Sequence, residues 1–337
     1  MRVVVTGAAG FIGSHLTADL VAAGHDVVAV DLPARIRAAG ALPEGVVPLG
    51  LDLAGDDLAP LTAAVTARRA HAVLHLAGRP GVRTSFGPGR AASVRHNVTA
   101  TRRLLAACRA AVGDRPGHQP AVVLASSSSV YGGARADRPQ REDDALRPVS
   151  PYARSKVRAE RLVLAAGDAG LPVLVLRYFS VYGSRQRPDM AFHRFVEAAL
   201  DGRPLPVLGG LEQRRSFTHV ADTVAGTVAA TAALVTGGVP SGTVLNLGHP
   251  VPASLGESVE LLGAMLDRRP AVALRPPAAG DVPRTWADGG RAERLLGWTP
   301  TVGLAEGLAE QLAWHRALRA GTPQAAGAAG AAGGPHG

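Results

Sequence analysis

The chain has 337 residues, 47% of them hydrophobic, and a formal net charge of +9. This length suffices for two domains, or for one large domain with a lobe, and no apolar run reaches the roughly 20 residues that span a membrane. The basic residues are scattered, so a nucleotide substrate explains the positive charge as well as a nucleic-acid partner does. Only 4% of the residues are aromatic, which leaves few side chains to stack on the bases of a single strand.

Two features bear on the compartment. The N-terminus begins directly with a strand pattern and shows no signal-peptide regions, so we expect a cytoplasmic protein. The single cysteine, Cys108, excludes an internal disulfide, and its apolar helical surroundings predict a core position.

The N-terminus reads as a strand at residues 2–6, a glycine turn, and a helix over residues 14–23. Glycines let the backbone turn tightly and approach a pyrophosphate, and the helix N-terminus supplies amide donors. The spacing Gly-x-x-Gly-x-x-Gly is a variant of the usual dinucleotide fingerprint, and a plain turn is the alternative. The cofactor-binding candidates in this turn are Gly7, Gly10, Phe11, Ile12 and Gly13.

A second strand, at residues 26–30, is followed by Asp31. A carboxylate in this place can accept hydrogen bonds from both ribose hydroxyls of adenosine and would repel a 2′-phosphate. The sequence therefore favours NAD over NADP.

Strands and helices continue to alternate, which demands a parallel sheet with helices on both faces. We expect an α/β fold with a Rossmann-type doubly wound parallel sheet. The further elements are a strand ending at residues 50–53, a helix over 56–69, a strand at 72–76, a helix over 91–112 and a strand at 121–125. His75 lies inside a strand and is interpreted as a core histidine. Ligands bind beyond the carboxyl ends of such strands, so the remaining cofactor candidates are Asp52, Leu53, Leu76, Ala77, Gly78 and Asn97.

The stretch from Pro151 to Lys156 places a phenol and an ammonium one helical turn apart, at Tyr152 and Lys156. Lys156 is the only lysine of the chain, which suggests a role that the broader guanidinium of arginine cannot fill. A nearby ammonium favours the charged form of a phenol, whose reference pKa is roughly 10. The pair therefore predicts a general base for an alcohol proton, and a surface helix with a chance tyrosine is the alternative.

Taken together, these motifs resemble the extended short-chain dehydrogenases/reductases, specifically the nucleotide-sugar epimerase/dehydratase family. The resemblance covers residues 1–316 and includes the serine run before Val130-Tyr131-Gly132. It implies that Tyr152 is the base, that Lys156 orients the nicotinamide ribose and lowers the tyrosine pKa, and that Ser127 holds the sugar 4-hydroxyl.

The neighbours of Ser127 select among the reactions of that family. Its dehydratases carry Asp-Glu just after the catalytic hydroxyl, and its uronate decarboxylases keep a Glu there, whereas this chain has Ser128 and Ser129. Without a carboxyl acid, elimination loses its proton donor, so epimerisation remains.

The second half is similar to the substrate lobe of the family, a smaller mixed α/β unit. We expect an NAD-binding domain at residues 1–178 to which 216–248 returns, a lobe at 179–318, and a disordered Ala/Gly tail at 319–337. By the resemblance, Arg215 binds the pyrophosphate and Asp281 lies near the uridine ribose.

Uronate 4-epimerases resemble this half best, because they have a small hydroxyl at the position of Ser180 and segments like those around Arg83 and Arg187. These arginines are candidates to face the sugar carboxylate, although Arg187 can instead pair with Asp189. The substrate-binding candidates are Arg83, Ser127, Ser128, Tyr152, Ser180, Arg187, Ala191, Phe192, Arg215 and Asp281.

The resemblance thus implies a UDP-sugar 4-epimerase with NAD, acting on UDP-glucuronate and UDP-galacturonate. UDP-glucose 4-epimerase and then UDP-glucuronate decarboxylase are the alternatives, and a catalytically silent dinucleotide-sensing or nucleic-acid-binding protein is another class. The family also implies a homodimer formed through residues 91–112 and 152–166, with no nucleic-acid or membrane partner.

Overall fold

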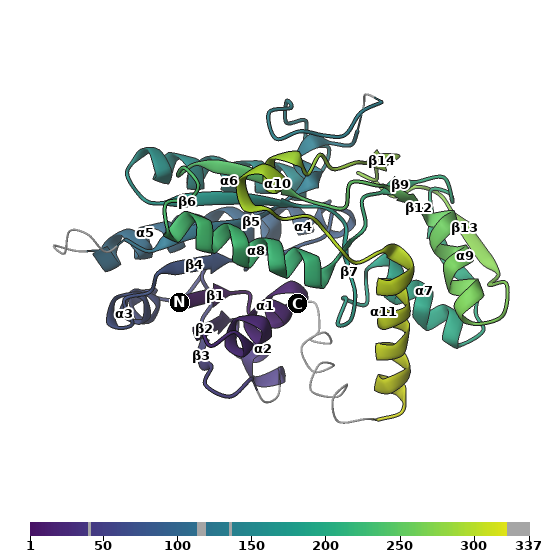
Figure 1. The fold of residues 1–337 in the computed structure, drawn as a ribbon, viewed down its shortest axis with the longest axis horizontal. Helices are drawn as coiled ribbons and strands as arrows, with labels where there is room; N and C mark the ends of the chain where they lie inside the picture. Colours follow the sequence, from purple (N-terminus) through teal and green to yellow (C-terminus); the bar gives the residue numbers. More distant parts are fainter. Residues whose placement is uncertain (40–41, 113–118, 135–136, 322–337) are drawn as a thin grey trace.

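The computed structural model describes residues 1–39, 42–112, 119–134 and 137–321 of the chain. Within them, seven strands form one sheet in which every pairing is parallel (Figure 1). The predicted α/β fold is confirmed. These strands are β1 (Arg2–Thr6), β2 (Asp26–Asp31), β3 (Val47–Gly50), β4 (Ala72–His75), β5 (Ala121–Ser127), β6 (Val173–Tyr178) and β11 (Thr243–Leu247).

The strand order is β11-β6-β5-β4-β1-β2-β3. The chain winds outward in one direction from β1 through β2 to β3, and in the other from β4 through β5 and β6 to β11. The direction changes between β1 and β4, and in doubly wound sheets a ligand crevice lies beyond the carboxyl ends of the strands at such a switch point.

Helices cover both faces of the sheet because its strands are apolar on both sides. Successive side chains of a strand point to opposite faces, so Val3 and Val5 enter one core and Val4 enters the other. The first core is covered by α1 (Phe11–Ala22), α8 (Val220–Val235) and α10 (Gly290–Leu296), and the second by α3 (Ala59–Ala67), α5 (Ala100–Val112) and α6 (Pro151–Asp168). Helix α2 (Pro33–Ala38) packs beside β3.

Two predicted core residues are confirmed. Cys108 is a buried free cysteine in α5. His75 is buried in β4, where Thr6 and Thr101 supply hydrogen-bond partners for its two ring nitrogens at 2.8 and 3.0 Å. Burial lowers the pKa of this imidazole to about 3, so it is neutral in the folded protein.

Some predicted boundaries were wrong. The predicted helix over 91–112 is divided into α4 (Gly89–Val94), a π-helical turn η2 (Arg95–Thr99) and α5. The strand predicted to reach residue 53 ends at Gly50, and β5 continues past residue 125 to Ser127. Arg319, placed in the predicted tail, is the last residue of α11 (Leu304–Arg319), and residues 322–337 lie outside the described residues.

The second half of the chain builds a smaller lobe beyond the carboxyl ends of the central strands (Figure 1). A separate aromatic and aliphatic core joins its helices, and it includes Phe192, Phe195 and Phe217. The remaining elements are β7 (Val181–Tyr182), α7 (Ala191–Leu200), β8 (Leu205–Leu208), β9 (Arg214–Arg215), β10 (Thr218–His219), β12 (Ala253–Ser254), α9 (Leu255–Met265), β13 (Val272–Arg275) and β14 (Arg284–Thr285). No described helix is long and apolar enough to cross a membrane.

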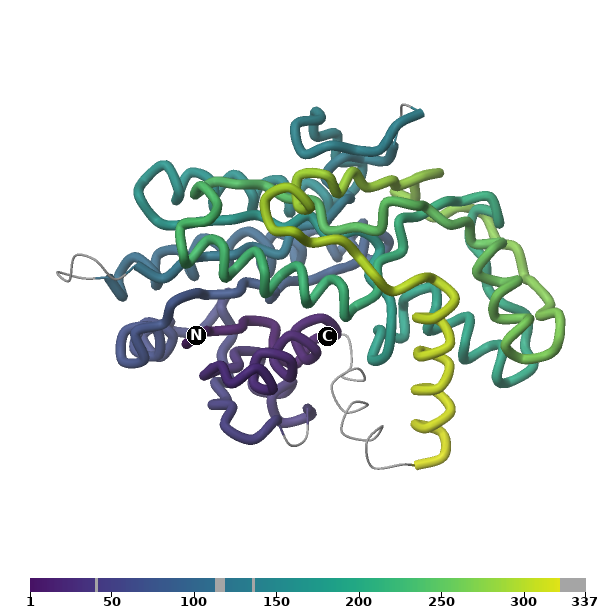
Figure 2. Tube along the Cα trace, in the orientation of Figure 1, coloured from purple at the N-terminus to yellow at the C-terminus, as the bar shows by residue number. Residues whose placement is uncertain are grey.

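The end of the described chain joins the two parts. Figure 2 shows the yellow segment leaving α10, which packs on α8 and β11, and entering α11, which packs on α7 and α9. Between these helices, the buried carboxylate of Asp222 accepts hydrogen bonds from the backbone of Thr301 and Val302 at 2.9 and 3.1 Å. The crossing segment is therefore anchored to the N-terminus of α8.

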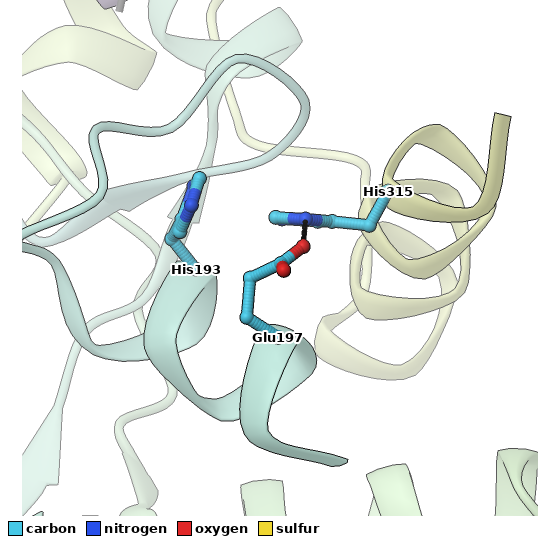
Figure 3. A group of neighbouring side chains, drawn as sticks. All are labelled: His193, Glu197 and His315. Carbon is cyan, nitrogen blue, oxygen red and sulfur yellow. Dashed lines mark hydrogen bonds and ion pairs between the residues drawn. The ribbon is translucent and has the colours of Figure 1, made fainter. Parts of the chain in front are cut away.

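Helices α7 and α11 are linked by His193, Glu197 and His315, whose side chains point toward one another (Figure 3). The Nδ1 atom of His315 lies 2.5 Å from one carboxylate oxygen of Glu197, and Arg319 lies 2.5 Å from the other. A metal ion at this cluster would have to displace Arg319, which already balances the charge of the carboxylate. We therefore interpret the cluster as a link between the helices.

Acid should destabilise the protein through its buried histidines. Burial lowers the pKa of His315 and of His15 to about 4, against an unfolded value near 6.5, so the unfolded chain takes up protons that the folded chain does not. The free energy of unfolding should fall by about 1–2 kcal/mol per histidine between pH 7 and pH 5. Urea denaturation at both values measures this. His315→Gln should flatten the pH dependence; a slope equal to that of the wild type would contradict the assignment.

Candidate active site

The carboxyl ends of β1 and β4 meet at the switch point of the sheet. Gly7 has φ +72°, and its N–H donates to Val30 O at 2.8 Å. A Cβ on Gly7 would lie 2.7 Å from Ala77 N, and one on Gly13 would lie 2.0 Å from Gly7 O. Only glycine permits these backbone approaches, and the resulting cradle is open at the N-terminus of α1.

Asp31, the last residue of β2, is positioned at this cradle. Its carboxylate accepts hydrogen bonds from Ala9 N at 3.0 Å and from Leu32 N at 2.8 Å. Burial raises its pKa, while these N–H groups and Arg35 oppose the rise. The Asp31 carboxylate is therefore fixed beside the glycine turn.

Asp52 follows β3 and is already partnered. Its side chain accepts from Ala54 N at 2.9 Å and from Arg95 at 2.8 Å. Burial is the largest single influence on the pKa of Asp52 and raises it. The hydrogen bond from Ala54 and the charge of Arg95 act in the opposite direction and together outweigh burial, so the net shift of the pKa is downward. The adjacent Leu53 side chain is buried.

The π-helical turn places Asn97 at the end of β4. Its Oδ1 accepts from Arg79 N at 2.7 Å, and its Nδ2 donates to Ser155 Oγ at 2.8 Å. A Cβ on Gly78 would lie 2.7 Å from this Oδ1 and 3.6 Å from Lys156 Nζ. The fold therefore brings Gly78, Asn97 and Lys156 together, and π-turns of this kind are frequent at functional sites.

Helix α6 starts immediately before the Tyr-x-x-x-Lys pair. Ser150 caps it by accepting from Ala153 N at 3.1 Å, and Pro151 occupies its first position. Lys156 is buried and donates to Ala125 O at 2.8 Å. Burial lowers its pKa to about 8.

The predicted effect of Lys156 on Tyr152 was wrong. Burial raises the pKa of the Tyr152 phenol above its ordinary value, and the influences that oppose this rise are a hydrogen bond with Ser127 and the charge of Arg187. The ammonium is held by the carbonyl of Ala125 instead of the phenol. Ser127 and, from the lobe, Arg187 are thus the groups that favour the ionised form of the Tyr152 phenol.

Three charged residues predicted to bind substrate lie together. Arg83 is paired with Asp281 through two hydrogen bonds of 3.3 and 3.2 Å. Arg215 is held by Pro283 O at 3.0 Å and Gln213 Oε1 at 3.1 Å, and its pKa is lowered to about 10, chiefly by burial. Both Asp281 and Arg83 act on it electrostatically.

Arg187 pairs with Asp189 through two hydrogen bonds of 2.9 Å, which is the alternative the sequence left open. Ser180 lies between β6 and β7, and its carbonyl accepts from Thr218 N at 3.1 Å. Ala191 begins α7, and the side chain of Phe192 is fully buried in the lobe core. Phe192 can therefore meet a substrate only through its backbone.

A model of the NAD dependent epimerase/dehydratase family matches residues 3–248. The chain belongs to this family. The residues present fit the dinucleotide, because the glycines let the turn close tightly before the N-terminus of α1 and the carboxylate of Asp31 stands beside that turn.

Relatives resemble the chain over nearly its whole length. A Bacillus subtilis (strain 168) protein named as an uncharacterized UDP-glucose epimerase is 36% identical and covers 95% of this chain and 100% of its own. MoeE5, solved in complex with UDP-glucuronic acid and NAD, is 41% identical with a TM-score of 0.81 and covers 94% of this chain and 99% of its own. UDP-glucuronic acid 4-epimerase from Bacillus cereus, solved with the same two ligands, is 34% identical with a TM-score of 0.84. It covers 94% of this chain and 100% of its own.

Three groups at this site were not singled out from the sequence. Ala125 receives Lys156 and Ala9 donates to Asp31, both through backbone atoms that no side-chain pattern reveals. Ser155 holds Asn97, and it also donates to Tyr152 O at 2.7 Å. Its position inside the Tyr-x-x-x-Lys stretch was a usable signal.

Gly13→Ala should weaken NAD binding. The new Cβ would collide with Gly7 O, so the cradle would have to open and the amide donors of α1 would move. We expect at least a tenfold loss in affinity, which is about 1.4 kcal/mol, measured by titration calorimetry. Gly256→Ala on α9 is the control, since its Cβ meets only ordinary contacts. Unchanged NAD affinity in a folded Gly13→Ala protein would contradict this view of the cradle.

Proposed function

We propose that this chain is a UDP-sugar 4-epimerase that interconverts UDP-glucuronate and UDP-galacturonate with tightly held NAD. The observation that carries the proposal is the group of Tyr152, Ser127 and Arg187, in which Ser127 and the charge of Arg187 both favour the ionised form of a buried phenol. This group suits a base acting on a sugar hydroxyl near a carboxylate. The relatives solved with UDP-glucuronic acid and NAD support the same substrate.

The cofactor would lie across the switch point of the sheet and supply the hydride acceptor. The cradle of Gly7, Gly10 and Gly13 would receive its pyrophosphate, and Asp31 its adenosine ribose. Lys156, beside Gly78 and Asn97, would hold the nicotinamide ribose. Phe11, Ile12, Asp52, Leu53, Leu76 and Ala77 are the remaining proposed contacts.

Tyr152 would take the proton of the sugar 4-hydroxyl, which Ser127 holds in place. The phenolate that this needs is disfavoured by burial, which raises the pKa, and favoured by Ser127 and the charge of Arg187. C4 would give its hydride to NAD, leaving a 4-keto sugar. The sugar would rotate about its pyrophosphate bonds and take the hydride back on its other face, with the proton returned from Tyr152. No net oxidation occurs, because the same hydride is removed and restored.

The neighbours of Ser127 support epimerisation over elimination. Ser128 and Ser129 lie in the 3-10 turn that follows β5, where the dehydratases and decarboxylases of this family would need a carboxyl acid. Elimination of water would have no acid here to protonate the leaving group.

The lobe would clamp UDP and leave the sugar free to turn. Arg215 would face the pyrophosphate and Asp281 the uridine ribose. Because the charge of Arg187 acts on Tyr152, whereas Arg83 pairs with Asp281, we favour Arg187 over Arg83 as the partner of the sugar carboxylate, with Ser180 and the backbone of Ala191 and Phe192 beside it.

A uronate substrate adds a hazard, because a 4-keto group lies β to the C6 carboxylate and invites loss of CO2. Holding the carboxylate near the plane of the keto group would keep the breaking bond from overlapping the carbonyl π system. Arg187 and Ser180 are proposed to impose this orientation.

Three further expectations are proposals from the family resemblance. The domain division would follow the central sheet and the lobe, with residues 216–248 assigned to the first. The protein would be a cytoplasmic homodimer that pairs residues 91–112 and 152–166 of each subunit. Analytical ultracentrifugation tests the dimer.

UDP-glucose 4-epimerase is the second candidate. The Bacillus subtilis relative is named as a UDP-glucose epimerase, and MoeE5 has also been solved with UDP-glucose and NAD. Separate incubations with UDP-glucuronate and UDP-glucose, analysed by chromatography, decide between them. UDP-galacturonate as the main product supports our proposal, UDP-galactose supports the alternative, and released CO2 with a UDP-pentose indicates a decarboxylase.

Arg187→Ala should lower turnover of UDP-glucuronate by roughly tenfold or more and leave UDP-glucose turnover much less affected, because only the uronate offers a carboxylate to the guanidinium. Measured kcat/KM on both substrates gives the comparison. Arg203→Ala is a matched control, since Arg203 also pairs with an aspartate two residues away, Asp201, but lies on the exposed lobe surface. Equal losses on both substrates would remove Arg187 from carboxylate recognition.

A further inference from the structure

A buried carboxylate that the proposed reaction does not use lies beneath the site. Glu160 on α6 is only 2% exposed. Its Oε1 accepts from Ser126 Oγ at 2.5 Å and from Arg177 Nε at 3.1 Å, and its Oε2 accepts from Arg177 Nη2 at 2.8 Å. Such a pair is costly to desolvate and is by itself weak support for stability, so its position calls for a reason.

The position follows the spacing of the site. Tyr152, Lys156 and Glu160 are each four residues apart and therefore share one face of α6. Their partners are Ser127, the carbonyl of Ala125 and the hydroxyl of Ser126, three consecutive residues at the end of β5. Glu160 thus completes a row of contacts that fixes the end of the strand against the helix.

Glu160 also faces the ammonium of Lys156. The titratable groups around that ammonium are Tyr152 and Glu160 on α6, His75 on β4 and, beyond Glu160, Arg177 on β6. His75 is neutral, because burial lowers its pKa to about 3. Burial likewise lowers the pKa of Lys156, and the charge of Glu160 is what opposes that shift.

Arg177 keeps Glu160 in place. Besides the carboxylate, its Nη1 donates to the Tyr131 hydroxyl and to Glu142 O, both at 2.9 Å. Tyr131 in turn donates to Asn246 Oδ1 at 2.7 Å. The guanidinium is therefore held from several sides and presents a fixed fork to Glu160.

We propose that Glu160 is a positioning residue, which holds the Ser126–Ser127 end of β5 against α6 and supplies the negative charge that keeps the buried ammonium of Lys156 protonated. Its part in turnover rests on the proposed function. Its effect on Lys156 does not, because that effect is a property of the protein without substrate.

The chain allows this effect to be measured directly, because Lys156 is its only lysine. Biosynthetic labelling with lysine carrying ¹³C at the ε position should give a single side-chain resonance, whose shift reports protonation. In Glu160→Gln we expect it to titrate at lower pH than in the wild type, by roughly one pH unit. The alkaline limb of kcat/KM should move in the same direction.

Glu142→Gln is the matched control. Glu142 is also buried; its backbone oxygen accepts from Arg177 Nη1 at 2.9 Å and its carboxylate accepts from Asn246 N at 2.9 Å, but it is not among the charges that act on Lys156. Its loss should lower the melting temperature without moving the lysine titration. The proposal would be overturned if Lys156 titrated at the same pH in Glu160→Gln as in the wild type. It would also be overturned if Glu142→Gln moved the Lys156 titration as far as Glu160→Gln does.

Glu160→Gln leaves Arg177 buried without its counter-charge and can therefore fold poorly. A second variant keeps the proposal testable in that case. Glu160→Gln with Arg177→Met removes both charges, a replacement that buried pairs often tolerate. The lysine should again titrate at lower pH than in the wild type. A wild-type titration in this double variant would assign the effect to the stranded guanidinium and refute the role of Glu160. Failure of both UDP-sugar incubations would refute the proposed function and leave this result intact.

Discussion

The close approach of two backbones at the centre of the sheet is the constraint on which the site depends. Gly7 and Ala77 follow the ends of the neighbouring strands β1 and β4, and their separation leaves no room for a side chain on Gly7. The same approach aligns the end of β4 with the cradle before α1, so that Asp31 reaches one side of it while Gly78, Asn97 and Lys156 gather on the other. A dinucleotide bound across this point would meet the groups on both sides of it.

The sheet could be predicted from the sequence because its strands are short apolar runs separated by helical patterns. The glycine turn and the Tyr-x-x-x-Lys pair could be predicted for the same reason, since each depends on local spacing. The π-helical turn at Arg95–Thr99 could not, because one extra residue in a turn leaves no mark on side-chain periodicity. The pairing of Arg83 with Asp281 joins residues 198 apart in sequence, and only the fold shows that the two candidates neutralise each other.

The protonation of Tyr152 shows where local spacing misleads. One helical turn separates phenol and ammonium, but the Ala125 carbonyl holds the ammonium, and burial penalises the charged form of both groups. Desolvation therefore outweighs the proximity that the sequence suggested. The charges that act on this pair come from outside the motif, from Glu160 for the lysine and from Arg187 for the tyrosine.

The two ion pairs near the reacting centre differ in a way that suits their proposed roles. Arg177 and Glu160 are 5% and 2% exposed at their side chains, so separating them would strand a buried charge. Arg187 and Asp189 are 26% and 37% exposed, and pairs of that kind contribute only about 0–1 kcal/mol. Arg187 can therefore exchange Asp189 for a substrate carboxylate at small cost, since the incoming group offers the same two oxygens. The fixed pair of Arg177 and Glu160 would keep Tyr152 and Lys156 in place. The exchangeable pair of Arg187 and Asp189 would allow the sugar to rotate between the two hydride transfers.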